Sequence, residues 1–185
     1  MKLILASNSP RRKQILETAG YNFDIVLGDF EENEVSKDPV VTAKTFAFGK
    51  AMAVFNRLQR SDALVLGADT VVYLKGKILG KPKDEEDAIK TLKSLSGKTH
   101  KVITGFALIA ENRFICRSVK TKVTFNKLTD EMILQYVQSG LYQGKAGSYG
   151  IQDPYPLVKS YKGSLTNVIG LPIEKLKPIL DKMLK

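Results

Sequence analysis

Hydrophobic runs and amphipathic stretches alternate along most of this chain. Continuous apolar segments predict strands over Leu3–Ala6, Tyr21–Leu27, Ala63–Leu66, Lys101–Ala110 and Arg113–Phe125. Apolar positions at helical spacing predict helices over Pro10–Ala19, from Pro39 through Leu58, after Asp84, between Thr129 and Gly140, and over Glu174–Met183. The alternation of strands and helices places the chain in the α/β class.

Residues suited to helix N-termini precede most of these helical patterns. Ser9 stands before Pro10, and Asp38 stands before Pro39, which fits an N-cap followed by proline in the first helical position. Asp84 and Thr129 precede the two next helices. Their side-chain oxygens are expected to accept hydrogen bonds from backbone N–H groups of the first turn.

The segment LASNSPRRKQIL joins the first strand to the first helix and carries two arginines in the first helical turn. A helix N-terminus already has partial positive charge, so cations there are unfavourable by about 0.3–1 kcal/mol. An anion would offset this cost, because Arg11, Arg12 and free backbone N–H groups all donate hydrogen bonds to phosphate. The hydroxyls of Ser7 and Ser9 can join them. The alternative is that both arginines are solvated surface residues.

The segment LGADTVV has the same strand-to-turn pattern. The apolar run Ala63–Leu66 is expected to end at Gly67, which leaves Asp69 at the carboxyl end of a strand, where ligands bind in α/β sheets. A carboxylate in that place can hold a divalent metal or position a water for attack. The alternative is a turn aspartate that bonds its own backbone.

Two further stretches carry candidate ligand-binding charges. Lys81 lies on a Gly-Lys-Pro turn in LGKPKDEEDA, just before a capped helix. It is either a phosphate contact or a turn lysine in water. Glu31 and Glu32 lie in an acidic loop over residues 28–37. Their carboxylates are either magnesium ligands or solvated charges.

Composition narrows the partner and the chemistry. The net charge of +10 indicates an anionic partner. The lysines are spread along the chain without stacking aromatics, which favours a phosphate-bearing small molecule over nucleic acid. The segment SLSGKTH is no P-loop, because Leu92 stands where that motif needs glycine. His100 is the only histidine, so a Ser-His-Asp or zinc site is disfavoured, and a structural role with a bond to the backbone is expected.

Cysteine content and hydropathy bear on the compartment. Cys116 is the only cysteine, which excludes an internal disulfide and favours a reducing compartment. No apolar run approaches the roughly 20 residues of a membrane span, and the N-terminal segment lacks the pattern of a signal peptide. We therefore expect a cytoplasmic protein without a membrane partner.

Six motifs in series resemble the Maf family of nucleoside triphosphate pyrophosphatases. They are LASNSPRR, GADTVV, LGKPKDEEDA, LSGKTHKVITG, KAGSYGIQ and NVIGLP, and they span nearly the whole chain. The resemblance implies a single α/β domain over residues 1–185, with two lobes, a mixed, bent sheet, flanking helices and a cleft between the lobes, as in inosine triphosphatases. It also implies hydrolysis of the α–β phosphoanhydride of a nucleoside triphosphate, which gives the monophosphate and pyrophosphate, with Mg²⁺, Mn²⁺ or Co²⁺ as the divalent cation.

The resemblance also implies roles for individual residues at the reaction centre. Asp69 matches the catalytic acidic residue of the family, which also lies near the metal. Glu32 matches a second acidic residue near the metal, although the neighbouring Glu31 leaves the register open. Lys50, in FGKAMAV, matches a substrate-binding lysine on the long helix.

The remaining matched positions are expected to contact the substrate. Ser7, Arg11, Arg12 and Lys81 match the polar ring around the phosphates. Arg12, Thr70 and Gln152 match three positions that separate the branches of the family. This combination is similar to the branch that acts on dTTP and UTP, and it differs from that of the branch that acts on 7-methyl-GTP.

The glycine-rich segment departs from the family pattern. An acidic residue and a proline usually follow the glycine matched by Gly140, where this chain has leucine and tyrosine. Aspartate usually precedes the lysine matched by Lys145, where this chain has Gly144, and glycine usually follows GIQ, where it has Asp153. These changes bear on base selectivity. The rival interpretation is a non-catalytic nucleotide- or nucleic-acid-binding regulator of cell division, and homodimer formation is left open.

Overall fold

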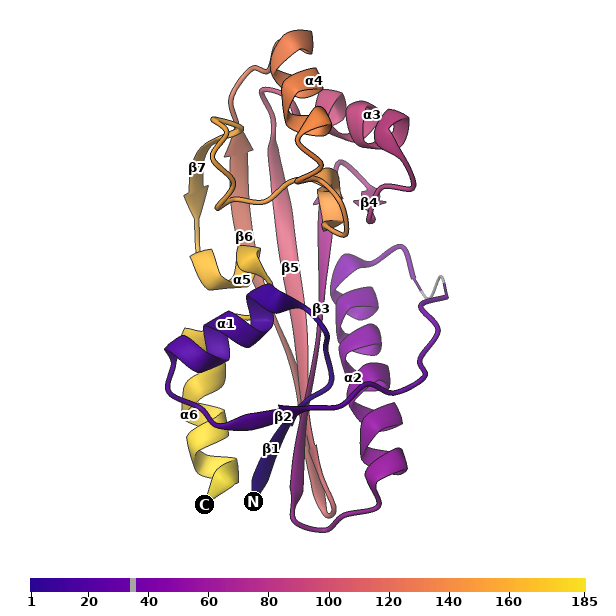
Figure 1. Ribbon diagram of the computed structural model, residues 1–185, viewed down its shortest axis with the longest axis vertical. Helices are drawn as coiled ribbons and strands as arrows, with labels where there is room; N and C mark the ends of the chain where they lie inside the picture. The colour runs from indigo at the N-terminus through magenta and orange to yellow at the C-terminus, as the bar shows by residue number, and fades with distance from the viewer. Residues whose placement is uncertain (34–35) are drawn as a thin grey trace.

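A computed structural model describes residues 1–33 and 36–185 and shows a mixed sheet flanked by helices (Figure 1). The sheet has the strand order β2-β1-β3-β5-β6-β7, and β4 pairs with β3 outside this path. β1 is parallel to β2 and β3, and the other pairs are antiparallel. The strands are β1 (Lys2–Leu5), β2 (Phe23–Ile25), β3 (Ala63–Leu74), β4 (Lys77–Leu79), β5 (Thr99–Ala110), β6 (Arg113–Phe125) and β7 (Val158–Lys162).

The described residues form six α-helices, of which the first four along the chain begin where the sequence predicts them. They are α1 (Pro10–Thr18), α2 (Pro39–Leu58), α3 (Glu85–Leu95), α4 (Asp130–Gln138), α5 (Leu165–Ile169) and α6 (Ile173–Leu184), with a 3₁₀ turn over Ala146–Ser148. The side chains of Ser9, Asp38, Asp84 and Thr129 each accept hydrogen bonds from backbone N–H groups in the first turn that follows. The predicted N-caps are therefore confirmed.

The first strand is buried on both faces. Leu3 and Leu5 pack in one apolar cluster with α1 and α6, whereas Ile4 packs in another with Ala47 and Ala51 of α2. Because both faces meet helices, the strand has the continuous apolar run that is typical of a covered parallel strand.

β3 is longer than the sequence predicts. It continues from Ala63 through Gly67 to Leu74 and pairs with β5 beyond the expected break. A Cβ added to Gly67 would lie 2.2 Å from the backbone oxygen of Ala47, so this glycine permits close packing of α2 on the sheet. The predicted strand end at Gly67 is therefore wrong, and Asp69 lies inside a strand.

The strands β3, β5 and β6 pass through both halves of the molecule (Figure 1). In the half that holds the termini, α1, α2 and α6 cover the strands. In the other half, α3 and α4 pack on the same strands, where Leu92 and Tyr136 join a cluster with Val72 and Val102. The two-lobed α/β fold with a mixed sheet is confirmed.

Three short elements differ from the prediction. β2 covers Phe23–Ile25, which is shorter than the predicted 21–27. β7 and α5 were not predicted, because β7 is mostly exposed and polar and α5 has five residues, too few for a helical period to show. Among the described residues, we find no helix with the length and apolarity that a membrane crossing requires.

Candidate active site

A cavity of about 600 Å³ lies between the two halves. This volume is typical of small-molecule sites, which span about 300–1,000 Å³. The walls come from residues 6–12, 27–32, 143–153 and 168–170, together with side chains of α2 and β3. The cavity brings together the residues that the sequence singled out for the site, with the exception of Glu31: Ser7, Arg11, Arg12, Glu32, Lys50, Asp69, Thr70, Lys81 and Gln152.

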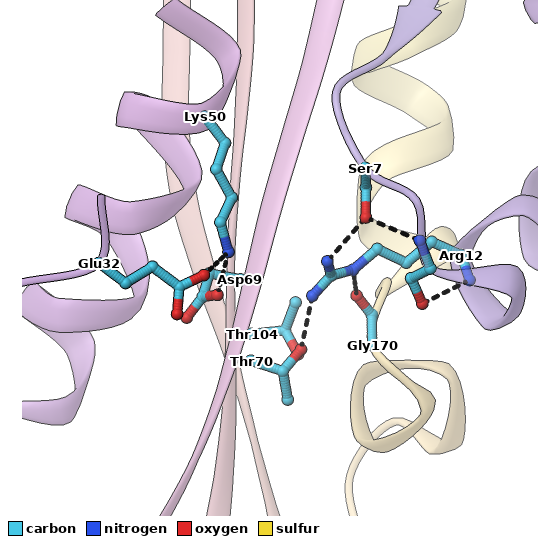
Figure 2. Close-up of polar contacts among 9 residues, drawn as sticks. Ser7, Arg12, Glu32, Lys50, Asp69, Thr70, Thr104 and Gly170 are labelled. Atoms are coloured by element: carbon cyan, nitrogen blue, oxygen red, sulfur yellow. Dashed lines mark hydrogen bonds and ion pairs between the residues drawn. The ribbon is translucent and has the colours of Figure 1, made fainter. Parts of the chain in front are cut away.

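A lysine between two carboxylates forms one side of the cavity (Figure 2). The Lys50 Nζ of α2 donates to Oδ1 of Asp69 at 2.6 Å and lies 2.5 Å from Oε1 of Glu32. Asp69 is buried, with 6% of its surface exposed. Glu32 lines the cavity and Glu31 does not, which favours Glu32 as the site residue of the acidic loop. The part of that loop at residues 34–35 lies outside the described residues.

The two carboxylates have opposite pKa shifts. Burial raises the pKa of Asp69, and the charges of Lys50 and Arg12 offset this only in part. Burial acts in the same direction on Glu32, but the hydrogen bond and charge of Lys50 outweigh it, so the pKa of Glu32 is lowered. Of the two carboxylates, only Asp69 has a pKa above its ordinary value.

Arg12 lies on the other side of the cavity and links three segments (Figure 2). Its Nε donates to the carbonyl oxygen of Gly170 at 2.9 Å, and its Nη1 donates to Oγ of Ser7 at 3.0 Å. Its Nη2 donates to Oγ1 of Thr70 at 3.3 Å. Burial lowers the pKa of Arg12, while the carboxylate of Asp69 acts in the opposite direction. The interpretation of Arg12 as a solvated surface residue is therefore wrong.

Thr70 and Thr104 continue the hydrogen bonds of Arg12 as a chain in which each hydroxyl accepts from the group before it and donates to the next. The hydroxyl of Thr104 donates to the carbonyl oxygen of Asn167 at 2.8 Å, so its oxygen accepts from Thr70 across 2.9 Å. Thr70 in turn accepts from Arg12. Each hydroxyl has a defined donor and acceptor role, which fixes Thr70 and Arg12 relative to β5 and α5.

Sequence reasoning missed several residues of this site. Thr104 and Gly170 carry no local signal, because their contacts with Thr70 and Arg12 arise only in the folded chain. Lys145 also lines the cavity. Its place in the motif KAGSYGIQ is the signal that could have found it.

His100 is structural, but its partner differs from the expected one. Its Nε2 lies 2.7 Å from the hydroxyl of Tyr149 rather than on a backbone group, and its ring stacks edge-on against Phe125. Burial lowers the pKa of His100 to about 4, so the ring is neutral at pH 7. The backbone interpretation of His100 is therefore wrong.

The candidate metal ligands are two carboxylates. In the described parts of the chain, no three His, Cys, Asp or Glu side chains gather in one place. The oxygens of Glu32 and Asp69 nevertheless converge on a single cation, the ammonium group of Lys50. Two carboxylate oxygens are a donor set that suits Mg²⁺, which takes one or two protein carboxylates and completes its shell with water and phosphate oxygens.

Comparisons with known proteins identify the family of this chain and agree with its fold. A dTTP/UTP pyrophosphatase of Aquifex aeolicus (strain VF5) is 42% identical over 184 residues, which are 99% of this chain and 96% of that protein. A dTTP/UTP pyrophosphatase of Ruminiclostridium cellulolyticum is 44% identical over 186 residues, with 98% and 95% covered. The structure of the Staphylococcus aureus Ham1 protein matches with a TM-score of 0.51 at 12% identity, over 68% of this chain and 72% of that one, which is a likeness of fold. The family described as Maf-like protein matches residues 2–183, and the chain belongs to this family.

Proposed function

We propose that the protein is a nucleoside triphosphate pyrophosphatase that hydrolyses the α–β phosphoanhydride of dTTP and UTP. The observation that carries this proposal is the buried carboxylate of Asp69, which faces a cavity that also holds Lys50, Arg11, Arg12 and Lys81. The cationic side chains suit an anionic substrate. The carboxylate can accept the proton of a water that attacks this substrate. The names of the two curated relatives support the choice of dTTP and UTP.

The cationic side chains bind and orient the triphosphate. Arg11 and Arg12 lie in the first turn of α1, beside the backbone N–H groups of a helix N-terminus. Lys81 lines the same cavity from the β4–α3 connection and is close enough to Glu32 to lower its pKa. Their positive charge stabilises the negative charge that develops on the departing pyrophosphate.

Asp69 takes the proton of the attacking water. The water oxygen bonds to phosphorus of the α–β anhydride, the bridging P–O bond breaks, and the proton passes to the Asp69 carboxylate. The products are the nucleoside monophosphate and pyrophosphate. Its raised pKa makes Asp69 a better base than an aspartate in water, because the efficiency of a general base rises as its pKa approaches the working pH.

Glu32 and Asp69 would hold a divalent cation, with Mg²⁺, Mn²⁺ and Co²⁺ as candidates. When bound, such an ion supplies positive charge to the phosphate oxygens and helps to form the nucleophile. Lys50 provides the positive charge between the same two carboxylates in this structure. A binding protein without catalysis has no use for a buried carboxylate that faces phosphates, so the hydrolase is the stronger proposal.

We also infer that the protein acts in the reducing environment of the cytoplasm. Cys116 is a free thiol that is half-buried against α2, where its Sγ donates to the carbonyl oxygen of Lys44 at 3.6 Å. Burial raises the pKa of the Cys116 thiol, which keeps it protonated and unreactive.

A pyrophosphate-release assay tests the function. The wild-type protein is incubated with Mg²⁺ and a panel of canonical nucleoside triphosphates, and pyrophosphate and orthophosphate are measured separately. We expect pyrophosphate from dTTP and UTP above all. Orthophosphate in its place would contradict the cleavage position. No turnover with Mg²⁺, Mn²⁺ or Co²⁺ would contradict the enzyme itself.

A further inference from the structure

Lys145 and Asp153 form a buried ion pair on the cavity wall that the proposed hydrolysis does not use. The Lys145 Nζ donates to Oδ1 of Asp153 at 2.7 Å and to Oδ2 at 2.6 Å. The side chains are 11% and 12% exposed. Two charges held so far from water need a reason, because removing them from water costs free energy that the pair only partly returns.

Tyr136 of α4 holds this pair in place. Its hydroxyl donates to Oδ2 of Asp153 at 2.7 Å and accepts from the backbone N–H of Gly150 at 3.2 Å. Burial and the nearby carboxylate raise the pKa of Tyr136, so the hydroxyl keeps its proton. The pair therefore has a fixed position and fixed donor and acceptor roles.

The backbone at Gly150 packs directly against the ion pair. A Cβ added there would lie 2.6 Å from Oδ2 of Asp153 and 2.7 Å from Nζ of Lys145. A side chain at position 150 would displace the ion pair. The backbone thus comes as close to both charged groups as it can, which leaves the cavity as the side from which a ligand can reach them.

The ion pair has one donor and one acceptor that make no hydrogen bond to the described residues. An ammonium group has three N–H donors, and Lys145 donates two of them to Asp153. The Oδ1 of Asp153 accepts one hydrogen bond and has a lone pair left, whereas its Oδ2 already accepts two. Among the described residues, one donor of Lys145 and one acceptor of Asp153 thus remain for a ligand.

The charge of this wall suits a base rather than a phosphate. Lysine and aspartate cancel each other, so the wall offers no net charge. Ala146, Tyr149 and Ile151 line the cavity beside the pair and supply apolar surface. Arg12 and Lys81 come from other segments and act on the pKa of Glu32, which leaves the 143–153 segment for the uncharged end of a nucleotide.

We propose that Lys145 and Asp153 recognise the imide edge of a pyrimidine base, with Lys145 donating to O4 and Asp153 accepting from N3–H. Uracil and thymine both present a carbonyl acceptor next to an N–H donor, and the pair presents the complement. Cytosine presents an amino donor next to a bare nitrogen acceptor, so both groups of the pair would face the wrong partner. The inference rests on the proposed function and adds the specificity-determining residues.

The wild-type protein gives the first test, with altered nucleotides. The ratio of kcat/KM for UTP to that for CTP is expected to be about 100 or more, because a site built to hydrogen-bond a polar group strongly rejects an analogue that lacks it. N3-methyl-UTP, which has no N3 donor, is expected to lose at least about tenfold in kcat/KM. Equal turnover of UTP and N3-methyl-UTP would overturn the inference without touching the proposed hydrolysis, whereas no turnover of any nucleotide would overturn both.

The variant Asp153→Asn gives the second test, because its amide can donate to N3 of cytosine. We expect the UTP/CTP ratio to fall by at least about tenfold. The matched control is Asp130→Asn, which alters an exposed aspartate that pairs with Lys93 at 2.9 Å, and it should leave the ratio unchanged. A purely structural role for Asp153 would lower kcat/KM for both nucleotides equally, and that result would contradict the inference.

Discussion

Replacing Arg12 with alanine should destabilise the nucleotide-free protein. The guanidinium group joins Ser7 after β1, Thr70 on β3 and Gly170 after α5 through hydrogen bonds of 3.0, 3.3 and 2.9 Å. The sequence alone gives the opposite expectation, because an arginine at a helix N-terminus is unfavourable unless an anion lies beside it. The two effects oppose each other, so their magnitudes decide the sign.

The hydrogen bonds outweigh the helix field. A hydrogen bond from a charged donor contributes about 1.5–3 kcal/mol. All three acceptors line the cavity, so water replaces part of what is lost, and we count one such bond rather than three. Relief from the helix field returns up to about 1 kcal/mol. The net loss is about 0.5–2 kcal/mol, which for a domain of this size lowers Tm by about 1–8 °C.

Calorimetry without nucleotide measures this loss, and Arg11→Ala is the matched control. Arg11 lies in the same turn and the same helix field, but among the described residues its side chain shows no hydrogen bond or ion pair. We expect Arg11→Ala to keep Tm or raise it slightly, and Arg12→Ala to lower both Tm and kcat/KM, the latter by about tenfold or more. An Arg12→Ala protein that melts at or above the wild-type temperature would refute the reasoning.

Three further predictions concern the reaction centre, pH dependence and packing. Asp69→Asn should keep the fold and lower kcat by about 10²–10⁴-fold, because the amide cannot accept the proton of water; a near-wild-type rate in the pyrophosphate assay would contradict this. The pKa of His100 is about 4 in the folded protein and about 6.5 when unfolded, so the unfolded state binds more protons between these values. Stability should therefore fall as pH drops from 6.5 to 4, by roughly 3 kcal/mol from this group, and urea unfolding of His100→Gln should show a flatter dependence over that window. Gly67→Ala should cost about 1–3 kcal/mol, because its Cβ meets the backbone oxygen of Ala47, whereas Gly80→Ala, with open space around its Cβ, should unfold within about 0.5 kcal/mol of wild type.

Helix starts were predictable because their cause is local. Ser9 and Asp38 each satisfy N–H groups two or three residues further along, so a short window of sequence contains both partners. The continuation of β3 was not predictable, because Gly67 looks the same in a turn as in a strand that packs against a helix. The group that decides between them is the backbone of α2 at Ala47, which only the fold brings there.

The sequence predicted most of the residues that line the cavity, but it did not predict the contacts among them. The resemblance named Glu32, Lys50 and Asp69, yet no spacing in the sequence says that one ammonium group lies between the two carboxylates. The bond from Arg12 to Gly170 spans 158 residues. Such pairs depend on how far each strand extends and which helix covers it, which a local pattern does not contain.

Two short strands pair with different parts of the same side of β3, and this explains why these residues meet. β3 pairs with β1 as far as Leu66 and with β4 from Val72 onward, so residues 67–71 lie between two partner strands. Successive side chains of a strand point to opposite faces, and here Asp69 meets Lys50 of α2 while Thr70 meets Arg12 of α1. Side chains from both faces can line one cavity because the edge between them has no strand beside it.

The segment that ends β1 therefore has two roles. Ser7 accepts a hydrogen bond from the backbone N–H of Ser9, and Ser9 caps α1, so the chain turns into the helix within a few residues after β1 ends at Leu5. A β1 longer by a few residues would cover the edge of β3 next to Asp69 and close the cavity from that side. The position of the cavity thus follows from the length of β1, and the same short segment that follows this strand supplies hydroxyls and a helix N-terminus to the cavity wall.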